Sequence, residues 1–444
     1  MTTAAAMPET FEEKRAAPRR RAWFTLILLL LLYMCSMLDR NIINVLVLPI
    51  QKEFGIGDFE MGLLLGPAFG LSYVILAFPL AWLGDRWSRR GVAAIGVVVW
   101  SLSNIAAGLS ASFETLFLAR IGVGAGEAAL LPAAYVLIAQ LFPQRGLALA
   151  LSIFSMGTIA GMGVGYGFGG WLLDLLEGGK HIQLIGHVES WRLVFFITGV
   201  PSLVLAGLLY FVPEKTRAQT GGKEASDVPL LPFLRRNPWS ALGLPLAFSM
   251  ASLSSAALLM WLPAYTMPAF GWSATAAGAA VAGLLIIPAT IGKIGSGLFV
   301  DWLFARGVKD AHPRYLMFAL MIAGPCAIAA FFVGATPFIA LLAIWFMLAY
   351  PVQGYGAAAI QLVTPEALRG RMSAIFTILV NIMAAGVAPT MVGYLSEYTF
   401  SGSGSLGLGM ITTVATWVPL TLLLLWKVLP MTRLAVEQHR QVEA

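Results

Sequence analysis

Long runs of apolar residues, separated by short polar segments, fill the chain from Ala22 almost to its end. A helix needs about 20 apolar residues to cross the hydrocarbon core of a bilayer. Twelve runs are long enough, so the pattern predicts twelve membrane-spanning helices and an all-α membrane protein. The expected spans are 22–50, 59–83, 92–111, 115–141, 147–173, 191–212, 239–267, 273–302, 314–333, 337–362, 371–398 and 406–429.

The longest polar insert, residues 213–238, lies between the sixth and seventh expected spans. Its Lys, Glu, Gly, Thr and Pro residues show no helical periodicity, which is typical of a linker. We therefore expect two six-helix bundles, residues 22–212 and 239–430, joined by this linker. Residues 1–21 and 431–444 are expected to be tails, and the first tail, without a cleavable signal sequence, to be disordered.

The two halves resemble each other in sequence. GDRWSRRG at Gly84–Gly91 matches VDWLFARG at Val300–Gly307, and the Arg-Gly pair at 145–146 matches the pair at 369–370 with nearly the same offset. This internal repeat predicts that the two bundles are pseudo-symmetric. Two such bundles can rock about a central site, which is the physical basis of alternating access.

The composition agrees with a membrane protein, because 59% of the residues are hydrophobic and only 11% are charged. Soluble domains contain about 25% charged residues. A net charge of +6 would also fit a nucleic-acid partner, but 22 of the 28 Lys and Arg residues lie in the tails and in the loops of one side. The positive-inside rule explains this placement without nucleic acid and puts both termini in the cytoplasm.

The first expected span contains an adjacent pair of charged residues, Asp39 and Arg40. A charge at the bilayer centre costs roughly 3 kcal/mol or more, so such residues normally serve a function. Tyr33, Ser36, Arg40 and Asn44 follow helical spacing and share one face, which we expect to point into the bundle. Tyr33, Arg40 and Asn44 are the residues of this face that we expect to contact a substrate. Asp39 lies at the edge of this face, where it can reach another helix.

The fourth expected span contains Arg120 and Glu127, seven residues apart. This spacing places them on one face of a helix, about 10 Å apart along its axis. Glycines at 122, 124 and 126 are expected to let a neighbouring helix approach closely.

The loop after the second span resembles the major facilitator superfamily signature G-x-L-x-D-R-x-G-R-[RK]. The matching residues are Leu83, Asp85, Arg86, Arg89 and Arg90. The resemblance implies that Asp85, Arg86 and Arg90 form a latch on the cytoplasmic side in the outward-open state, with Asp301 in a degenerate second copy. Alternatively, the arginines only determine the orientation of the protein in the membrane, but this role does not explain Asp85.

The pair Asp39-Arg40 and the run Gly124–Ala128 resemble the spinster group, whose members carry D-R in span 1 and G-x-G-E-A in span 4. The stretch Arg369–Gly393 resembles bacterial members of that group. The resemblance implies a protein of the bacterial inner membrane that transports lysophospholipids or sphingosine-1-phosphate-like lipids. It also implies that spans 1 and 4 line the cavity, where the four charges would meet. Neighbouring anion–cation symporter families share part of the span 4 pattern and transport small organic anions.

The leading hypothesis is therefore a proton-coupled secondary transporter for an amphipathic lipid, with small organic anions as the alternative substrates. Asp39 and Glu127 would carry protons, because a carboxylate separated from its arginine in a low-dielectric cavity binds a proton and releases it on re-pairing. Arg40 and Arg120 would hold an anionic head group. Two permanent salt bridges between spans 1 and 4 are the alternative, although buried ion pairs stabilise weakly.

Two residues of the second half are further candidates for substrate contacts. Lys293 has no acidic neighbour three or four positions away, so it either binds a phosphate or carboxylate or extends to the membrane interface. Gln353 is an amide that would be costly to leave unpaired in lipid. The spans contain no histidine pair, no H-E-x-x-H and no nucleotide-binding P-loop, so we expect neither an enzyme nor a cofactor. A monomer is expected.

Overall fold

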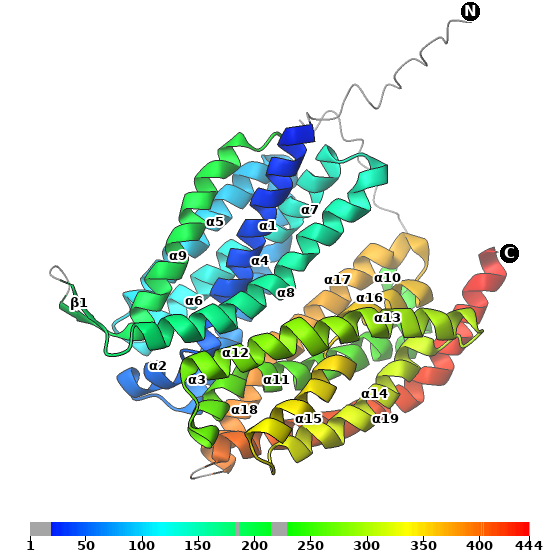
Figure 1. Cartoon of the computed structure of the whole chain (residues 1–444). Coiled ribbons are helices and arrows are strands. Elements are labelled where there is room, and N and C mark those ends of the chain that lie inside the picture. The colour runs from blue at the N-terminus through cyan, green and yellow to red at the C-terminus, as the bar shows by residue number, and fades with distance from the viewer. Residues whose placement is uncertain (1–18, 183–185, 215–228, 401, 403, 444) are drawn as a thin grey trace, which may run out of the picture.

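The computed structural model describes residues 19–182, 186–214, 229–400, 402 and 404–443. Twelve of its helices are long and apolar enough to cross a membrane. They form two bundles that lie side by side (Figure 1). The predicted fold class, an all-α membrane protein with two six-helix bundles, is confirmed.

The first bundle has six spans, of which the second and fourth are each built from two consecutive helices. Its elements are α1 (Arg19–Asn41), η2 (Ile42–Asn44), α2 (Val47–Phe54), α3 (Asp58–Leu65), α4 (Pro67–Arg86), α5 (Arg89–Gly108), α6 (Phe113–Glu127), α7 (Leu130–Leu141), α8 (Gln144–Leu175), β1 (Lys180–Ile182), β2 (Gly186–Val188), α9 (Ser190–Leu208) and η3 (Leu209–Phe211). The strands β1 and β2 form a small antiparallel hairpin that the sequence pattern did not predict.

The second bundle also has six spans, several of them interrupted by short π-helical segments. Its elements are α10 (Leu230–Arg236), η5 (Trp239–Gly243), α11 (Leu244–Phe270), α12 (Ala274–Leu284), η6 (Leu285–Ala289), α13 (Thr290–Ala305), α14 (Ala311–Ala330), α15 (Ala335–Leu348), α16 (Val352–Val363), η7 (Glu366–Leu368), α17 (Arg369–Val380), η8 (Asn381–Val387), α18 (Ala388–Tyr394), η9 (Leu395–Thr399) and α19 (Ser405–Glu443). The span α11 is the most buried of the twelve.

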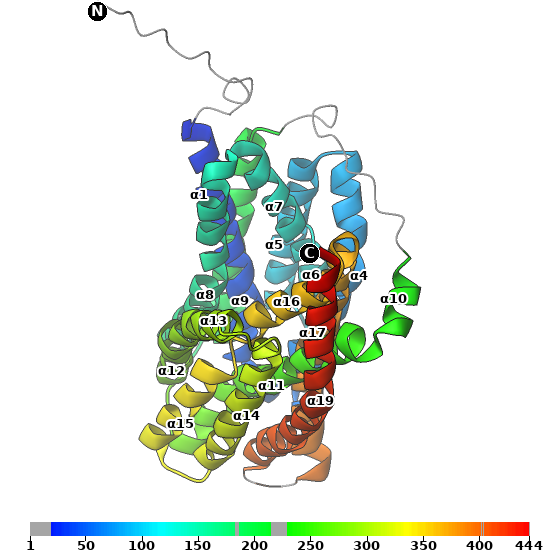
Figure 2. The ribbon, with the colours of Figure 1, turned by 90° about the vertical axis from the view of Figure 1, so that its right-hand side faces the viewer.

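Three expected boundaries are wrong. The first span does not continue to residue 50, because α1 ends at Asn41, whose side-chain amide donates to the carbonyl of Met37 at 2.7 Å and competes with the helix. The expected tail 431–444 is helical as far as Glu443, and Val436 packs against the core. The expected linker contains α10, which lies at the edge of the bundle with Phe233 packed against the core (Figure 2).

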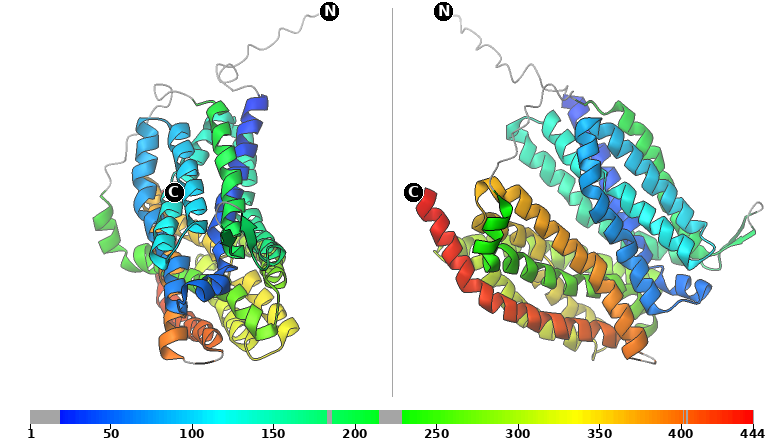
Figure 3. Two further views of the ribbon diagram at one scale, coloured as in Figure 1. Left: turned by 90° about the vertical axis from the view of Figure 1, so that its left-hand side faces the viewer. Right: turned by 180° about the vertical axis from the view of Figure 1, so that it is seen from behind.

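We call the side that carries the start of α1 and the end of α19 the terminal side, and the opposite side the far side. The two bundles contact each other in their far-side parts and diverge toward the terminal side (Figures 1 and 3). Gly66 faces the backbone carbonyl of Ala385, and Gly170 faces the carbonyl of Ala274, so a Cβ atom at either glycine would overlap with backbone. Backbone from both bundles is therefore in direct contact on the far side.

Two carboxylates on the far side each cross from one bundle to the other. Asp174, near the end of α8, accepts hydrogen bonds from the backbone nitrogens of Ala274 at 3.2 Å and Thr275 at 2.8 Å. Glu397, at the end of the eleventh span, accepts from the backbone nitrogen of Phe59 at 2.8 Å. Both carboxylates thus satisfy free N–H groups in the first turn of a helix of the other bundle. We call these two contacts the far-side clamps. The residues of one clamp are separated from the corresponding residues of the other by nearly the same number of positions as the matched segments of the internal repeat.

Candidate functional site

A buried ion pair joins the first and fourth spans. Arg40 on α1 donates to Oε2 of Glu127 on α6 through Nη2 at 2.9 Å and Nε at 3.2 Å. Ser36, one turn before Arg40, donates to the same oxygen at 2.8 Å. The Arg40 side chain remains 25% exposed, whereas that of Glu127 is fully buried. The other oxygen of Glu127, Oε1, is buried without a hydrogen-bond partner in the described part of the chain.

Aromatic rings cover the Arg40 guanidinium from the second span. Its central carbon lies 4.2 Å from the ring centroid of Phe69 and 5.0 Å from that of Tyr73. A guanidinium attracts aromatic faces, and this attraction is stronger where water is excluded. Arg40 is thus placed between a carboxylate and two rings, and the sequence pattern did not predict which rings would contact it.

Arg120 is completely buried and caps the end of α1. Its Nη1 and Nη2 donate to the backbone carbonyls of Asp39 at 3.3 Å and Arg40 at 3.2 Å. The last carbonyls of a helix have no partner within the helix and carry a partial negative charge, which favours a cation at this point. The positive charge of Arg120 therefore stabilises the place where α1 ends.

The Asp39 carboxylate is hydrogen bonded to the third and sixth spans rather than to an arginine side chain. It accepts from Nδ2 of Asn104 on α5 at 3.0 Å and from the hydroxyl of Ser202 on α9 at 3.3 Å. Asn104 also donates to the hydroxyl of Thr198 on α9 at 3.2 Å. Asp39 is fully buried and has neutral donors as its hydrogen-bond partners. Asp39 is therefore not part of the Arg40–Glu127 ion pair, although its charge interacts with those of Glu127 and Arg120.

Close packing of the fourth span makes this arrangement possible. Gly124 faces the backbone carbonyl of Phe69, and Gly126 faces the backbone of Gly96 and Trp100. A side chain at either glycine would overlap with the backbone of a neighbouring helix and displace α6, which carries Glu127. The glycine run predicted this close approach, and the structure shows it.

The other two residues of the polar face on span 1 have partners in the protein. Tyr33 stacks on Phe154 with 4.9 Å between ring centroids and accepts a hydrogen bond from Thr158 at 3.0 Å. Asn44 is buried and donates to the hydroxyl of Tyr166 on α8 at 2.6 Å. The Tyr166 hydroxyl in turn donates to a carbonyl of α11. Asn44 therefore belongs to the contact between the bundles.

Lys293 and Gln353 both belong to the second bundle. Each is exposed, Lys293 on α13 and Gln353 at the start of α16. Neither takes part in the hydrogen bonds of the Arg40–Glu127 pair. Their roles as substrate contacts remain predictions.

The expected latch residues lie at the terminal side. Asp85 forms an ion pair with Arg89 at 2.8 Å rather than with Arg86 or Arg90. The Arg86 guanidinium lies over the ring of Trp82 at 4.2 Å. Among the described residues, Asp85 makes no hydrogen bond or ion pair with the second bundle. The latch therefore remains a prediction for a different conformation.

Arg90 connects two segments of the first bundle instead. Its Nη1 donates to the carbonyls of Tyr210 and Val212, both at 3.0 Å, at the end of the sixth span. Asp301, the degenerate counterpart of Asp85, is exposed near the end of α13.

The sequence interpretation missed Asn104 and Ser202, the partners of Asp39. A signal for Asn104 was present, because it is an amide within an otherwise apolar third span. Ser202 gave no comparable signal, because serine can satisfy its hydroxyl within its own helix.

Twelve membrane-spanning helices in two bundles, with charges buried between spans 1 and 4, define a multi-pass membrane transporter. A sequence profile of the Major Facilitator Superfamily matches residues 29–389. The chain belongs to this superfamily and resembles its spinster group.

Several named proteins are similar to the chain. An MFS-type efflux pump of Mycolicibacterium smegmatis is 28% identical over 92% of each chain. Protein spinster homolog 1 of Rattus norvegicus is 28% identical over 76% of this chain and 63% of its own length. A probable L-galactonate transporter of Escherichia coli is 25% identical over 89% of this chain and 87% of its own length.

A solved structure confirms the architecture. The crystal structure of a bacterial homolog to the human lysosomal transporter Spinster, in an inward-facing and unoccupied conformation, matches with a TM-score of 0.77. The two sequences are 24% identical, and the match covers 95% of this chain and 98% of the other. At this identity the likeness shows the fold.

Proposed function

We propose that this transporter works by alternating access, is coupled to protons, and moves an amphipathic lipid with an anionic or zwitterionic head, such as a lysophospholipid or a sphingosine-1-phosphate-like molecule. The observation that carries the proposal is the buried Arg40–Glu127 pair, because its cation is partly exposed while its carboxylate is fully buried. The resemblance of Asp39-Arg40 and Gly124–Ala128 to the spinster group, which implies lipid transport, supports a lipid substrate.

The pair provides a mechanism for exchanging a proton against a substrate anion. A phosphate head group that reaches the exposed side of Arg40 competes with Glu127 for the guanidinium. Glu127 then loses its counterion in a low-dielectric environment, where the neutral form is favoured, and binds a proton. Re-pairing after the head group leaves expels this proton.

Asp39 and Arg120 complete the proposed site. Asp39 is hydrogen bonded by neutral donors, so it can hold a proton without breaking an ion pair. Arg120 would add a second positive charge that attracts the head group. It would act from its buried position at the end of α1.

The conformation is assigned as inward-open, with the terminal side in the cytoplasm of a bacterial cell. The positive-inside pattern supports this orientation, and the divergence of the two bundles toward the terminal side supports the state (Figures 1 and 3). The two bundles, expected as residues 22–212 and 239–430, would move about the central contact. The far-side clamps would open, and Asp85, Arg86 and Arg90 would form their latch with the second bundle.

Transport by purified protein in proteoliposomes tests the proposal. With an imposed pH gradient, lysophospholipid or sphingosine-1-phosphate should move against its concentration gradient, and Glu127→Gln should abolish this uphill movement. Glu114→Gln is the matched control, because Glu114 is an exposed glutamate on the same helix. The proposal is wrong if Glu127→Gln transports normally or if the gradient has no effect on lipid movement.

The alternative is a proton-coupled transporter of small organic anions, which the L-galactonate relative supports. A carboxylate can compete for Arg40 in the same way as a phosphate. Galactonate and glucarate therefore belong in the same panel. If they move and the lipids do not, the alternative replaces the lipid proposal while the role of Glu127 stands.

A further inference from the structure

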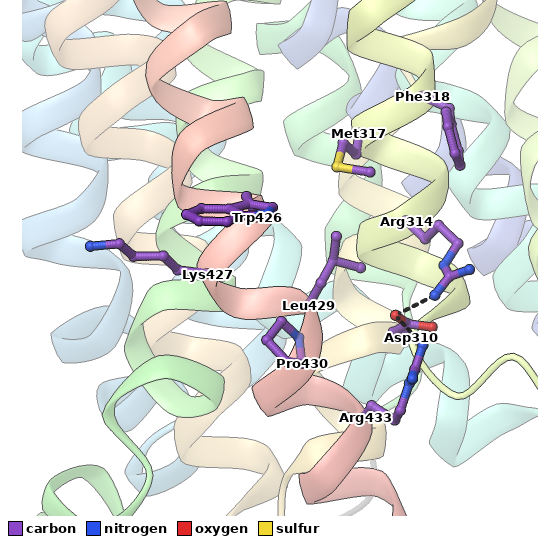
Figure 4. Close-up of a pocket in the computed structure, with 9 residues that line it drawn as sticks. All are labelled: Asp310, Arg314, Met317, Phe318, Trp426, Lys427, Leu429, Pro430 and Arg433. Atoms are coloured by element: carbon purple, nitrogen blue, oxygen red, sulfur yellow. Dashed lines mark hydrogen bonds and ion pairs between the residues drawn. The ribbon is translucent and has the colours of Figure 1, made fainter.

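A cavity of about 520 Å³ lies between α14 and α19 on the outer surface of the second bundle (Figure 4). It is distant in the chain from the charged residues of spans 1 and 4. Its lining residues are Asp310, Arg314, Met317, Phe318, Trp426, Lys427, Leu429, Pro430 and Arg433. The cavity thus combines a charged base with apolar walls.

Two arginines share one carboxylate at the base. Nη2 of Arg314 lies 2.8 Å and Nη2 of Arg433 lies 3.4 Å from the same oxygen, Oδ2, of Asp310. The Asp310 side chain is only 3% exposed, whereas Arg314 and Arg433 are 36% and 49% exposed. One negative charge is therefore surrounded by two positive charges, and the base carries an excess positive charge that faces outward.

Both guanidiniums retain unused donors. A guanidinium has five N–H groups in a planar fork that matches the geometry of a phosphate. In the described part of the chain, Arg314 and Arg433 make no further hydrogen bonds beyond those to Asp310. A phosphate oxygen can therefore bridge the two arginines while both keep Asp310.

The walls above this base are apolar and face away from the bundle. Phe318 is 54% exposed and Trp426 is 70% exposed, and they lie on opposite sides of the cavity (Figure 4). Both belong to helices long and apolar enough to cross a membrane, so we expect their exposed rings to face acyl chains. Lys427 extends away from the cavity, with its ammonium 5.7 Å from the ring of Trp239. The cavity thus opens toward lipid rather than toward the interior of the protein.

We propose that this cavity binds the head group of an anionic phospholipid. Its phosphate would bridge Arg314 and Arg433, and its acyl chains would lie along Phe318 and Trp426. Basic pockets between membrane helices at the level of the head groups have the charge and position to bind such lipids. The lipid connects α14 to α19 and stabilises the second bundle. The proposal does not depend on which substrate is transported.

Native mass spectrometry of the full-length protein tests the site, with phosphatidylglycerol and phosphatidylcholine of the same acyl chains as probes. Phosphatidylglycerol should be retained preferentially and should raise the unfolding temperature. Arg433→Gln should weaken its retention about fivefold, and Arg433→Lys should restore most of it, because each basic residue near a lipid head contributes about 1 kcal/mol. The control Arg236→Gln removes an exposed arginine of α10 and should change nothing.

Three results would overturn the site. The first is equal retention of the two lipids, and the second is normal retention by Arg433→Gln. The third is inorganic phosphate that raises the unfolding temperature as much as phosphatidylglycerol at the same concentration, which would indicate a site for free phosphate. Lipid retention is measured without transport, so failure here leaves the proposed transport function untouched.

Discussion

The two bundles have the same architecture but very different interiors. The first holds Asp39, Arg120 and Glu127, all fully or almost fully buried, together with the partly exposed Arg40. The second has a largely apolar interior around α11, and Lys293 is its only basic residue in the middle part of an expected span. Charge in the membrane is costly, so its concentration in one bundle indicates that this bundle carries the coupling chemistry.

The contacts between the bundles are, by contrast, nearly symmetric. Asp174 reaches from the first bundle to α12, and Glu397 reaches from the second bundle to α3. Gly170 lies against the backbone carbonyl of Ala274 at one clamp, and Gly393 lies in the same way against the backbone carbonyl of Asp58 at the other. The two halves of the chain thus make symmetric contacts with each other on the far side, whereas the interiors of the two bundles differ. The following changes test this division.

The largest effect is expected from Arg40→Gln. Breaking a buried ion pair by removing one partner costs about 3–5 kcal/mol, because the other charge remains buried. We expect a lower unfolding temperature and no gradient-driven transport. The double variant Arg40→Gln/Glu127→Gln should recover the unfolding temperature but not transport, as measured by thermal unfolding and proteoliposome uptake. A single variant as stable as the wild type would show that the pair is not formed in the membrane.

The next effect is expected from Gly66→Ala. The added methyl group meets the carbonyl of Ala385, and overpacking of this kind costs about 1–3 kcal/mol. We expect this contact to separate together with the far-side clamps, so the open far side should become more populated and transport should be slower. Labelling of engineered far-side cysteines measures the population. Gly207→Ala is the control, because its Cβ would meet nothing within 4 Å.

A moderate effect is expected from Asn104→Ala, which removes one hydrogen-bond donor from Asp39. Loss of one such bond costs about 0.5–1.5 kcal/mol, so transport driven by a pH gradient should slow by roughly two- to tenfold. Substrate exchange without a gradient should change less. Equal slowing of both processes would mean that Asn104 acts through packing alone.

A smaller and symmetric effect is expected from the clamps. Asp174→Asn and Glu397→Gln each remove a negative charge from a helix N-terminus, which contributes about 0.3–1 kcal/mol. Each variant should raise far-side cysteine labelling about two- to fivefold, by similar amounts. A large effect of one variant and none of the other would show that closure is asymmetric.

The smallest effect is expected from Lys293→Gln. An exposed charge contributes only about 0.2–1 kcal/mol to a pairwise interaction, so the KM for an anionic substrate should rise by no more than about fivefold. A loss of transport as large as that of Arg40→Gln would contradict the division between the bundles.

The sequence by itself determined the architecture, because each span must be long and apolar to cross the bilayer, and this requirement is visible in one dimension. It also identified Arg40 and Glu127, because charges are conspicuous in apolar helices. The close approach of span 4 to its neighbours was likewise visible in the spacing of its glycines.

Only the tertiary structure decided which groups meet. Asp39 and Arg40 are adjacent in sequence but point to different helices, so their partners depend on how spans 3, 4 and 6 pack around α1. The far-side clamps join residues that are far apart in the chain through backbone N–H groups, which every residue possesses and no sequence pattern reveals. The physical reason is that helical periodicity fixes the face on which a side chain lies, whereas its partner is fixed by the packing of helices against one another.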